Sequence, residues 1–364
     1  NNAFWSSVSS GGDDGMSAMA GEWRNRSDAS LITMNPGARD GEGEGEEVPY
    51  GVQGWFTRHV KELWEMYRGF NTVENTIRSF CKFVPEEVVR RLIHSGNEAD
   101  VLLERANITV MFCDLENFTE MSEGLDLRQL ATVMQVYFDI VCDSVEATGG
   151  CIDKFIGDGV MAIWNAPRSC YKHQSRAVEC AIQACARLAA SKKVLEEKNL
   201  PSIRARFGIN TGVCLVGNVG SAARLNFTAL GDVVNLASRL EALNKMYDSA
   251  ILVSKDVYSG ISDEFLGRFI DRIRVKGKKE ATDLFQIIGY HDKCTEVQHH
   301  LCSLTTKGTQ LMLNQDFVPA RNLFLDAAKL DDSDVPVRLL LERVKKYISK
   351  PESFSSIMKL ETKL

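Results

Sequence analysis

The chain has 364 residues, of which 44% are hydrophobic, and this suffices to bury a core and to form about two domains with tails. The formal net charge of −6 argues against a nucleic-acid-binding protein, which would normally carry a basic face. The ten cysteines are scattered without a CxxC pair, which favours reduced thiols in a cytoplasmic protein over disulfides or a structural zinc site.

The sequence contains no recognisable signal peptide and no apolar run of the length needed to cross a bilayer. It begins at Asn1 and not at a methionine. We therefore keep open that an upstream sensor or membrane domain precedes it, in which case this chain would be the cytosolic part of a membrane-anchored protein.

Residues 1–49 are rich in Gly, Ser, Asp and Glu, lack apolar periodicity and are predicted to be disordered. Residues 50–105 are predicted to form a helical linker, because their apolar residues recur three and four apart. These residues are Val60, Leu63, Tyr67, Phe70, Val73, Ile77 and Phe80. Two interpretations stay open: a helix packed on its own domain, or a dimeric signalling helix. A second short helix is predicted over residues 83–93, with Pro85 in its first turn.

Residues 106–290 alternate predicted strands and helices. Ile108–Cys113 reads as a buried strand. The long helix after it is predicted to begin with a capping box of Asp126 and Gln129 and to stop at Gly149. A second helix is expected from about residue 173 to 191, and a third over residues 232–244.

Two short motifs read as hairpin turns because Gly, Asp and Asn tolerate positive φ: Gly157-Asp158-Gly159 and Asn210-Thr211-Gly212. Residues 217–226 are small and polar and are predicted to be a mobile loop. Later strands are expected over residues 250–253, 269–275 and 284–288. The resulting β-α-β-β-α-β order with extra strands predicts an α+β, ferredoxin-like layer.

Residues 291–364 are predicted to be a helical extension. Their apolar spacing is typical of one tetratricopeptide-type helical hairpin, and a single such unit cannot build a solenoid. We expect it to cap the domain or its dimer, and we expect the last residues to be frayed.

Four polar residues point to chemistry on a nucleoside triphosphate. Asp114 closes the first strand and Asp158 lies in the first hairpin turn; each alone is an ordinary strand-end or turn residue. Together, two hard carboxylates suit Mg²⁺ or Mn²⁺. Asn235 and Arg239 are four residues apart and share one helix face, where they suit sugar and phosphate oxygens.

Residues 106–290 resemble the catalytic domain of class III nucleotidyl cyclases, across several separated motifs. The matching segments are Phe112-Cys-Asp-Leu-Glu-Asn-Phe-Thr119, Asp153-Lys-Phe-Ile-Gly-Asp158, Phe207-Gly-Ile-Asn-Thr-Gly212 and Phe227-Thr-Ala-Leu-Gly-Asp-Val-Val-Asn-Leu-Ala-Ser-Arg239. The resemblance implies attack of the ribose 3′-hydroxyl on the α-phosphorus, with pyrophosphate leaving.

The resemblance also assigns roles to these residues. It implies that Asp114, Asp158 and the backbone carbonyl of Leu115 hold two Mg²⁺ or Mn²⁺ ions. One ion would favour the alkoxide and the other would neutralise the phosphate oxygens. Asn235 and Arg239 are implied to hold the ribose and the α-phosphate in the transition state.

The implied base-reading pair is Lys154 and Thr228. Lys can only donate, which suits N1 of adenine, and Thr can accept from N6. Guanylyl cyclases of this family usually carry Glu and Cys there, so the resemblance implies ATP. Thr replaces the more common Asp, as in a subgroup with bicarbonate-responsive members, and discriminates less sharply. Bicarbonate is a candidate activator by resemblance only.

Two further positions follow from the resemblance. Lys276 or Lys278 would contact the terminal phosphates, and the sequence does not separate the two; a basic surface turn is as common a reading. The family usually has Gly where Asn117 stands, and Asn is the next best residue at positive φ, so we expect the loop to survive.

The family builds each active site between two domains, and this chain carries both sets of residues in one domain. It is therefore expected to be a homodimer with two shared sites that takes ATP. The alternatives are a guanylyl or mixed-specificity cyclase, a non-catalytic nucleotide-binding dimerisation module, and a polymerase-palm-like phosphotransferase. The intact polar residues count against the second alternative, and the absence of a basic nucleic-acid face counts against the third.

Overall fold

The structure is a computed structural model that describes residues 50–81, 83–84, 88–90, 93, 102–221, 224–275 and 281–360. The chain divides into two units between residues 71 and 72, inside the helix Tyr50–Phe80. The predicted disorder of residues 1–49, and both Lys276 and Lys278, lie outside the described residues.

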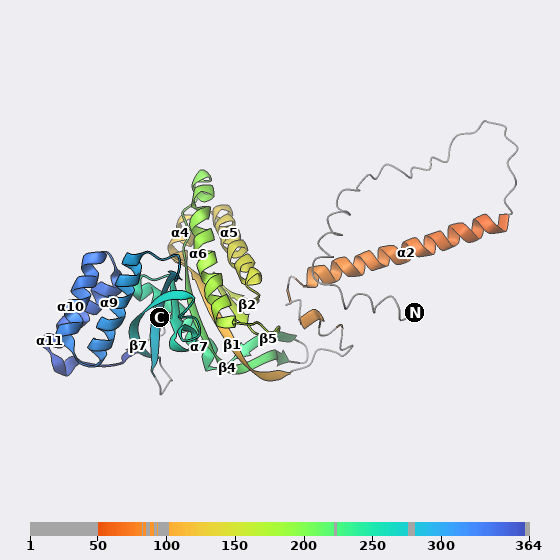
Figure 1. The fold of residues 1–364 in the computed structure, drawn as a ribbon. Coiled ribbons are helices and arrows are strands. Elements are labelled where there is room, and N and C mark those ends of the chain that lie inside the picture. The colour runs from red at the N-terminus through yellow and green to blue at the C-terminus, as the bar shows by residue number, and fades with distance from the viewer. Residues whose placement is uncertain are drawn as a thin grey trace. The chain divides into compact units, whose positions relative to one another are not determined.

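Helix α2 (Tyr50–Phe80) forms where the three-and-four spacing predicts it (Figure 1). Several of its apolar side chains are exposed, including Leu63, Phe70, Val73 and Ile77. Within the part of the chain that is described, no helix combines the length and apolar character that a bilayer crossing needs. Residues 88–90, inside the second predicted helix, are helical.

The described strands form one nine-stranded sheet in the order β2-β3-β1-β4-β6-β8-β7-β9, with β5 paired to β4. The strands are β1 (Leu103–Leu115), β2 (Cys151–Ile156), β3 (Gly159–Trp164), β4 (Ala205–Ser221), β5 (Arg224–Leu230), β6 (Ile251–Ser254), β7 (Phe265–Val275), β8 (Thr282–Tyr290) and β9 (Met358–Leu360). The antiparallel order β2-β3-β1-β4 confirms the ferredoxin-like prediction.

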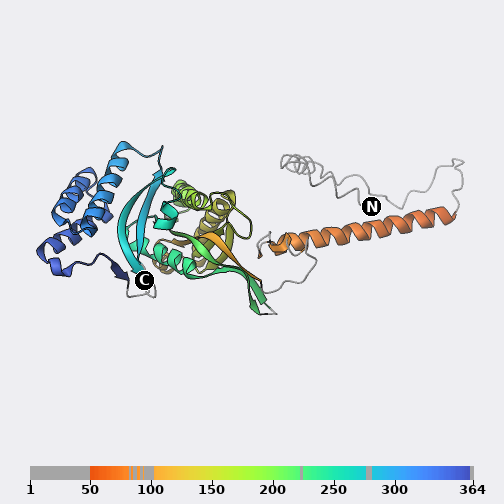
Figure 2. The ribbon, with the colours of Figure 1, turned by 60° about the horizontal axis from the view of Figure 1, so that its bottom comes forward.

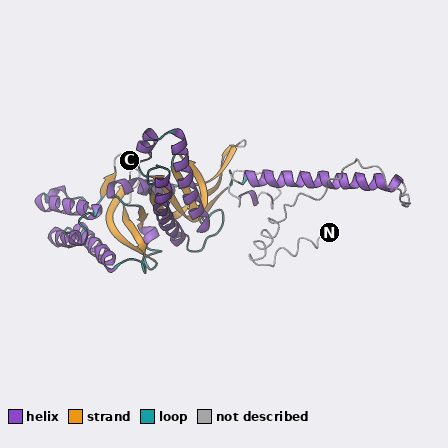
Figure 3. Cartoon of the chain, turned by 90° about the horizontal axis from the view of Figure 1, so that it is seen from above, coloured by secondary structure: helices purple, strands orange, loops and turns teal. Residues whose placement is uncertain are grey.

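Helices cover both faces of this sheet (Figure 3). Helices α5 (Leu127–Ala147) and α6 (His173–Glu197) pack on one face and α7 (Asp232–Tyr247) on the other. The other α-helices of residues 102–360 are α4 (Phe118–Gly124), α8 (Lys255–Tyr258), α9 (Glu296–Leu313), α10 (Phe317–Leu330) and α11 (Val335–Ser349). Side chains of β1 alternate between the faces: Met111 and Cys113 join the core with α5 and α6, whereas Ile108 and Val110 pack with β5 and α7.

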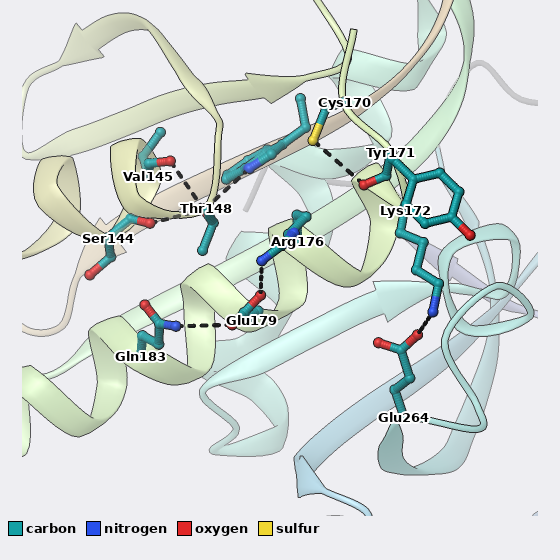
Figure 4. Close-up of polar contacts among 11 residues, drawn as sticks. Ser144, Val145, Thr148, Cys170, Tyr171, Lys172, Arg176, Glu179, Gln183 and Glu264 are labelled. Atoms are coloured by element: carbon teal, nitrogen blue, oxygen red, sulfur yellow. Dashed lines mark hydrogen bonds and ion pairs between the residues drawn. The ribbon is translucent and has the colours of Figure 1, made fainter. Parts of the chain in front are cut away.

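Helix α5 begins and ends where the sequence predicts. Asp126 and Gln129 form the capping box, and Gly149 after the last turn has φ 74°. The Trp164 indole donates to Thr148 Oγ1 at 3.3 Å, and that hydroxyl donates to the Ser144 carbonyl at 2.9 Å (Figure 4). The end of α5 is thereby fixed to β3.

Two sequence predictions about the middle of the chain are wrong. The Asn210–Gly212 motif is no turn, because β4 continues without interruption from Ala205 to Ser221 and pairs with β1 over its first part. The mobile loop predicted over residues 217–226 is wrong for the described residues of this segment, because Gly217–Ser221 pairs with Arg224–Thr228 in antiparallel fashion (Figure 2).

The described C-terminal part of the chain forms three α-helices and then adds one strand to the sheet. Helices α9 and α10 form a helical hairpin in which Gly308 packs against Phe324: a Cβ at Gly308 would lie 2.6 Å from Phe324 Cε1. After α11, Met358–Leu360 pairs in parallel with β7, so the predicted fraying is wrong for these three residues.

Two buried ion pairs fix α11 to β7. Arg268 Nη2 lies 2.7 Å from Asp334 Oδ2, and Arg343 Nη1 lies 2.5 Å from Asp271 Oδ2. The Tyr247 hydroxyl of α7 also donates to Asp271 Oδ2, at 2.6 Å. Asp271 therefore connects α7, β7 and α11.

Candidate active site

Asp114 and Asp158 lie close together, although they come from different parts of the chain. Asp114 is the penultimate residue of β1, and Asp158 lies in the turn between β2 and β3, where Gly157 has φ 65°. A Cβ at Gly159 would lie 3.1 Å from the Ile156 carbonyl oxygen and 3.7 Å from Asp114 Oδ1. Burial, followed by the hydrogen bond and the charge of Asp114, raises the pKa of Asp158 to about 6.

Arg206 and Glu241 lie beside the two aspartates, and sequence analysis missed both. We call Asp114, Asp158 and Glu241, with the Arg206 guanidinium among them, the acidic cluster. Arg206 Nη2 donates to Asp114 Oδ2 at 3.2 Å, and Arg206 Nε forms an ion pair with Glu241 Oε1 at 3.4 Å. Burial, followed by the charge of Asp114, raises the pKa of Glu241 to about 7, and Arg206 opposes this shift. The only sequence signal was the position of Arg206 directly before the Phe207–Gly212 motif.

The donor set of this cluster fits a hard divalent cation. Among the described residues, no three or more His, Cys, Asp or Glu side chains form a candidate metal site. Asp114 and Asp158 offer two carboxylates, and Mg²⁺ commonly takes one or two carboxylates together with water and substrate phosphates. Burial is the main cause of the raised pKa of Asp158, and the charge of Asp114 adds to it; a bound cation would relieve the repulsion between the two carboxylates. Leu115 ends β1, and its backbone carbonyl oxygen is the atom that could serve as a ligand, because the leucine side chain has no donor atom.

The base-reading pair predicted from the sequence is in direct contact. Lys154 Nζ of β2 donates to Thr228 Oγ1 of β5 at 3.1 Å. A third residue, Asp153, accepts a hydrogen bond from that hydroxyl at 2.6 Å and pairs with Lys154 Nζ at 3.4 Å. Sequence analysis assigned Asp153 no role.

Asn235 and Arg239 lie one turn apart on α7, which is fastened to β4 at both ends. Asn235 is exposed and Arg239 is half-buried. The Asn210 amide donates to the Val233 carbonyl at 3.0 Å, and the Asn244 amide donates to the Phe207 carbonyl at 2.9 Å.

Glycine is required at position 208 for this packing. A Cβ there would lie only 2.0 Å from the backbone nitrogen of Glu241, so no larger residue fits without moving α7. The position of α7, and of the two polar side chains it carries, therefore depends on the Phe207–Gly212 motif.

Comparison with known proteins identifies the family. Residues 102–289 match the model of the adenylate and guanylate cyclase catalytic domain. Over 231 residues the chain is 37% identical to Adenylate cyclase 1 of Rhizobium meliloti (strain 1021), a match that covers 64% of this chain and 35% of that protein. Over 232 residues it is 31% identical to an adenylate cyclase of Anabaena cylindrica, covering 60% of this chain and 44% of that protein.

A solved structure of a bacterial light-regulated adenylyl cyclase aligns with a TM-score of 0.54 at 25% identity, covering 62% of this chain and 65% of that one. The chain spans less than half the length of the two curated relatives above. Cyclases of this family generally use divalent metal ions and act as dimers. The chain belongs to the family of adenylate and guanylate cyclase catalytic domains.

Proposed function

We propose that the chain is an adenylyl cyclase that converts ATP to 3′,5′-cyclic AMP and pyrophosphate. The observation that carries the choice of ATP is the 3.1 Å hydrogen bond from Lys154 to Thr228. It sets a donor beside a hydroxyl that can accept, which matches N1 and N6 of adenine.

Asp114 and Asp158, with the Leu115 carbonyl, would hold two Mg²⁺ or Mn²⁺ ions. Bound there, the ions would favour the 3′-alkoxide and neutralise the β- and γ-phosphate oxygens. Arg206 donates a hydrogen bond to Asp114 Oδ2, and such a partner would orient the carboxylate for its ligand role.

Asn235 would orient the ribose, and Arg239 would stabilise the negative charge that develops on the α-phosphate. Arg suits this role because its guanidinium is planar, makes several hydrogen bonds and stays charged. Lys276 or Lys278 would contact the terminal phosphates.

The working protein would be a homodimer with two shared sites. One protomer would supply Asp114 and Asp158, and its partner would supply Lys154, Thr228, Asn235 and Arg239. In this proposal residues 106–290 are the catalytic domain, residues 50–105 the linker, and residues 291–364 an extension. The exposed apolar side chains of α2, among them Leu63, Phe70 and Ile77, are compatible with a linker that also dimerises.

The test is product formation by the purified chain from ATP or GTP in separate reactions, with Mg²⁺ or Mn²⁺. Cyclic AMP from ATP, lost in Asp158→Ala and retained in the surface control Asp139→Ala, supports the proposal. Cyclic GMP as the main product would instead favour a guanylyl cyclase. No product from either nucleotide, with a dimer demonstrated in solution, would favour a nucleotide-binding module.

A further inference from the structure

Asp153 is a buried acidic residue that has no role in the cyclase mechanism proposed above. Its side chain is only 1% exposed, whereas the neighbouring Lys154 side chain is 42% exposed. Both residues contact Thr228, itself 5% exposed: Thr228 Oγ1 donates to Asp153 Oδ2 at 2.6 Å, and Lys154 Nζ donates to Thr228 Oγ1 at 3.1 Å.

A bulge in β2 makes this arrangement possible. Successive side chains of a regular strand point to opposite faces, so neighbours do not normally reach the same partner. Between Ile152 and Lys154 the register of β2 with β3 shifts by one residue, and Asp153 is the extra residue. The shift allows Asp153 and Lys154 to contact one hydroxyl.

The hydrogen-bonding capacity of that hydroxyl can be counted. A Thr hydroxyl has one hydrogen and two lone pairs, and an ionised carboxylate can only accept. The 2.6 Å separation is within the range of a charge-assisted O–H···O⁻ bond, so the hydrogen is committed to Asp153. Lys154 uses one lone pair, which leaves one lone pair for a ligand.

Burial raises the pKa of the Asp153 carboxyl above its ordinary value, and the hydrogen bond from Thr228 and the charge of Lys154 offset part of this shift. The Lys154 ammonium, 3.4 Å from Asp153 Oδ1, compensates the buried negative charge.

We propose that Asp153 determines base specificity by positioning: it fixes the Thr228 hydroxyl as a hydrogen-bond acceptor toward the base. This inference rests on the proposed function, and it adds a residue to the two that would contact the base. With Thr228 fixed, Lys154 presents a donor and Thr228 an acceptor, which matches N1 and N6 of adenine.

Guanine presents the opposite pattern, a donor at N1 and an acceptor at O6. Its N1 donor would face the Lys154 donor, and its O6 acceptor would face the Thr228 acceptor. Without Asp153, the Thr228 hydroxyl could rotate and donate to O6. Replacement of Asp153 should therefore relax specificity, although Asp153 itself would not touch the base.

The experiment measures the ratio of kcat/KM for ATP to kcat/KM for GTP in the full chain. Asp153→Leu removes the acceptor, and we expect this ratio to fall about tenfold, the scale of one mispaired hydrogen bond. Asp153→Asn should also lower the ratio, because its amide can donate to Thr228; it keeps the side-chain volume if Asp153→Leu fails to fold. The surface variant Asp139→Asn is the control and should leave the ratio unchanged.

A double-mutant cycle tests whether Asp153 acts through Thr228. In a Thr228→Val background, Asp153→Leu should leave the ratio unchanged, because no hydroxyl remains to be oriented. An equal fall in both backgrounds, or no fall in a folded Asp153 variant of the otherwise native chain, would overturn the inference.

Binding of 3′-deoxy-ATP and 3′-deoxy-GTP, which lack the attacking hydroxyl, separates this inference from the proposed function. If the native chain makes no cyclic product but prefers 3′-deoxy-ATP, and Asp153→Asn loses that preference, the cyclase proposal fails and the inference stands. If the native chain cyclises ATP and the variant keeps the full preference in binding and turnover, the inference fails and the cyclase proposal stands.

Discussion

Arg206 Nη2 lies 3.2 Å from Asp114 Oδ2, so one of the two paired aspartates has a cationic partner within its own chain. The other edge of the same guanidinium faces Glu241, and the Arg206 side chain is only 14% exposed. One cation thus lies among three acidic groups that would otherwise repel each other: Asp114, Asp158 and Glu241.

Replacing Arg206 should destabilise the metal-free protein. Arg206→Met leaves Asp114 and Glu241 without their counter-charge, and we expect the free energy of unfolding to fall by about 2 kcal/mol, discounted from the 3–5 kcal/mol of a fully buried pair. Mn²⁺ should restore part of the loss. Denaturant unfolding with EDTA or with Mn²⁺ measures both effects.

Arg204→Met is the matched control for that variant. Arg204 also pairs with a carboxylate, Glu116, at 3.2 Å, but its side chain is 66% exposed. An exposed pair contributes at most about 1 kcal/mol, so the control should change stability little. Equal losses in the two variants would contradict the account of Arg206 as the compensating charge.

The acidic cluster should make stability depend on pH. The folded state raises the pKa of Asp158 to about 6 and that of Glu241 to about 7, so between about pH 4 and pH 7 it binds protons that the unfolded chain has released. The stability contribution is therefore present at low pH and is lost as pH rises through these values.

The corresponding measurement is thermal unfolding of metal-free protein from pH 5 to pH 8. We expect Asp158→Asn to flatten the decline and to stabilise the protein at pH 7.5 by roughly 1 kcal/mol, because solvent screens this partly exposed group. Addition of Mg²⁺ at pH 7.5 should stabilise the native protein more than it stabilises the Asp158→Asn variant. A native pH profile that rises over this range would refute the assignment.

A shared active site can be tested by mixing two inactive variants. Asp114→Ala and Arg239→Ala chains, mixed and allowed to exchange, should recover about a quarter of native cyclase activity, since half the dimers are mixed and each has one intact site. Arg239→Ala with Asn235→Ala should recover none, because both changes fall in the same half of the site. Equal recovery in both mixtures would rule out the proposed division between protomers.

The ion pair between Arg343 and Asp271 should matter more than any surface charge on α11. Asp271 is 0% exposed, and removing Arg343 takes away the cationic partner of a buried carboxylate that also accepts a hydrogen bond from the Tyr247 hydroxyl. Arg343→Met should therefore cost about 3 kcal/mol of unfolding free energy. The exposed Arg338 of the same helix serves as the control, and Arg338→Met should cost less than about 0.5 kcal/mol. Comparable losses in denaturant unfolding would contradict this role of the pair.

Features that depend on neighbouring residues could be predicted from the sequence. The capping box of Asp126 and Gln129 formed as expected, and Asn117 adopts positive φ, at 58°. The first hairpin formed because Gly157 supplies the left-handed conformation that its turn requires. In each case the physical cause lies within a few residues of the effect.

Features that depend on distant partners could not be predicted. Asn210 and Gly212 resemble turn residues, but the Asn210 amide bonds to α7, and a Cβ at Gly212 would lie 2.9 Å from Val233 Cγ2. Their composition reflects the approach of a helix and not a reversal of the chain. Arg206 and Glu241 were missed for the same reason, since no periodicity connects residues on β4 and α7 to a carboxylate on β1.

In one ion pair β7 supplies the cation, Arg268, and in the other it supplies the anion, Asp271. This limits where the chain can be truncated without leaving a buried charge unpaired. A protein ending at residue 289, the limit of the family match, would keep Arg268 and Asp271 but lose Asp334 and Arg343. Each half-pair would leave an unneutralised charge in the sheet, and the sheet would also lose β9. On a ribosome, the sheet that supports α7 would reach its final electrostatic balance only after residue 343 has emerged.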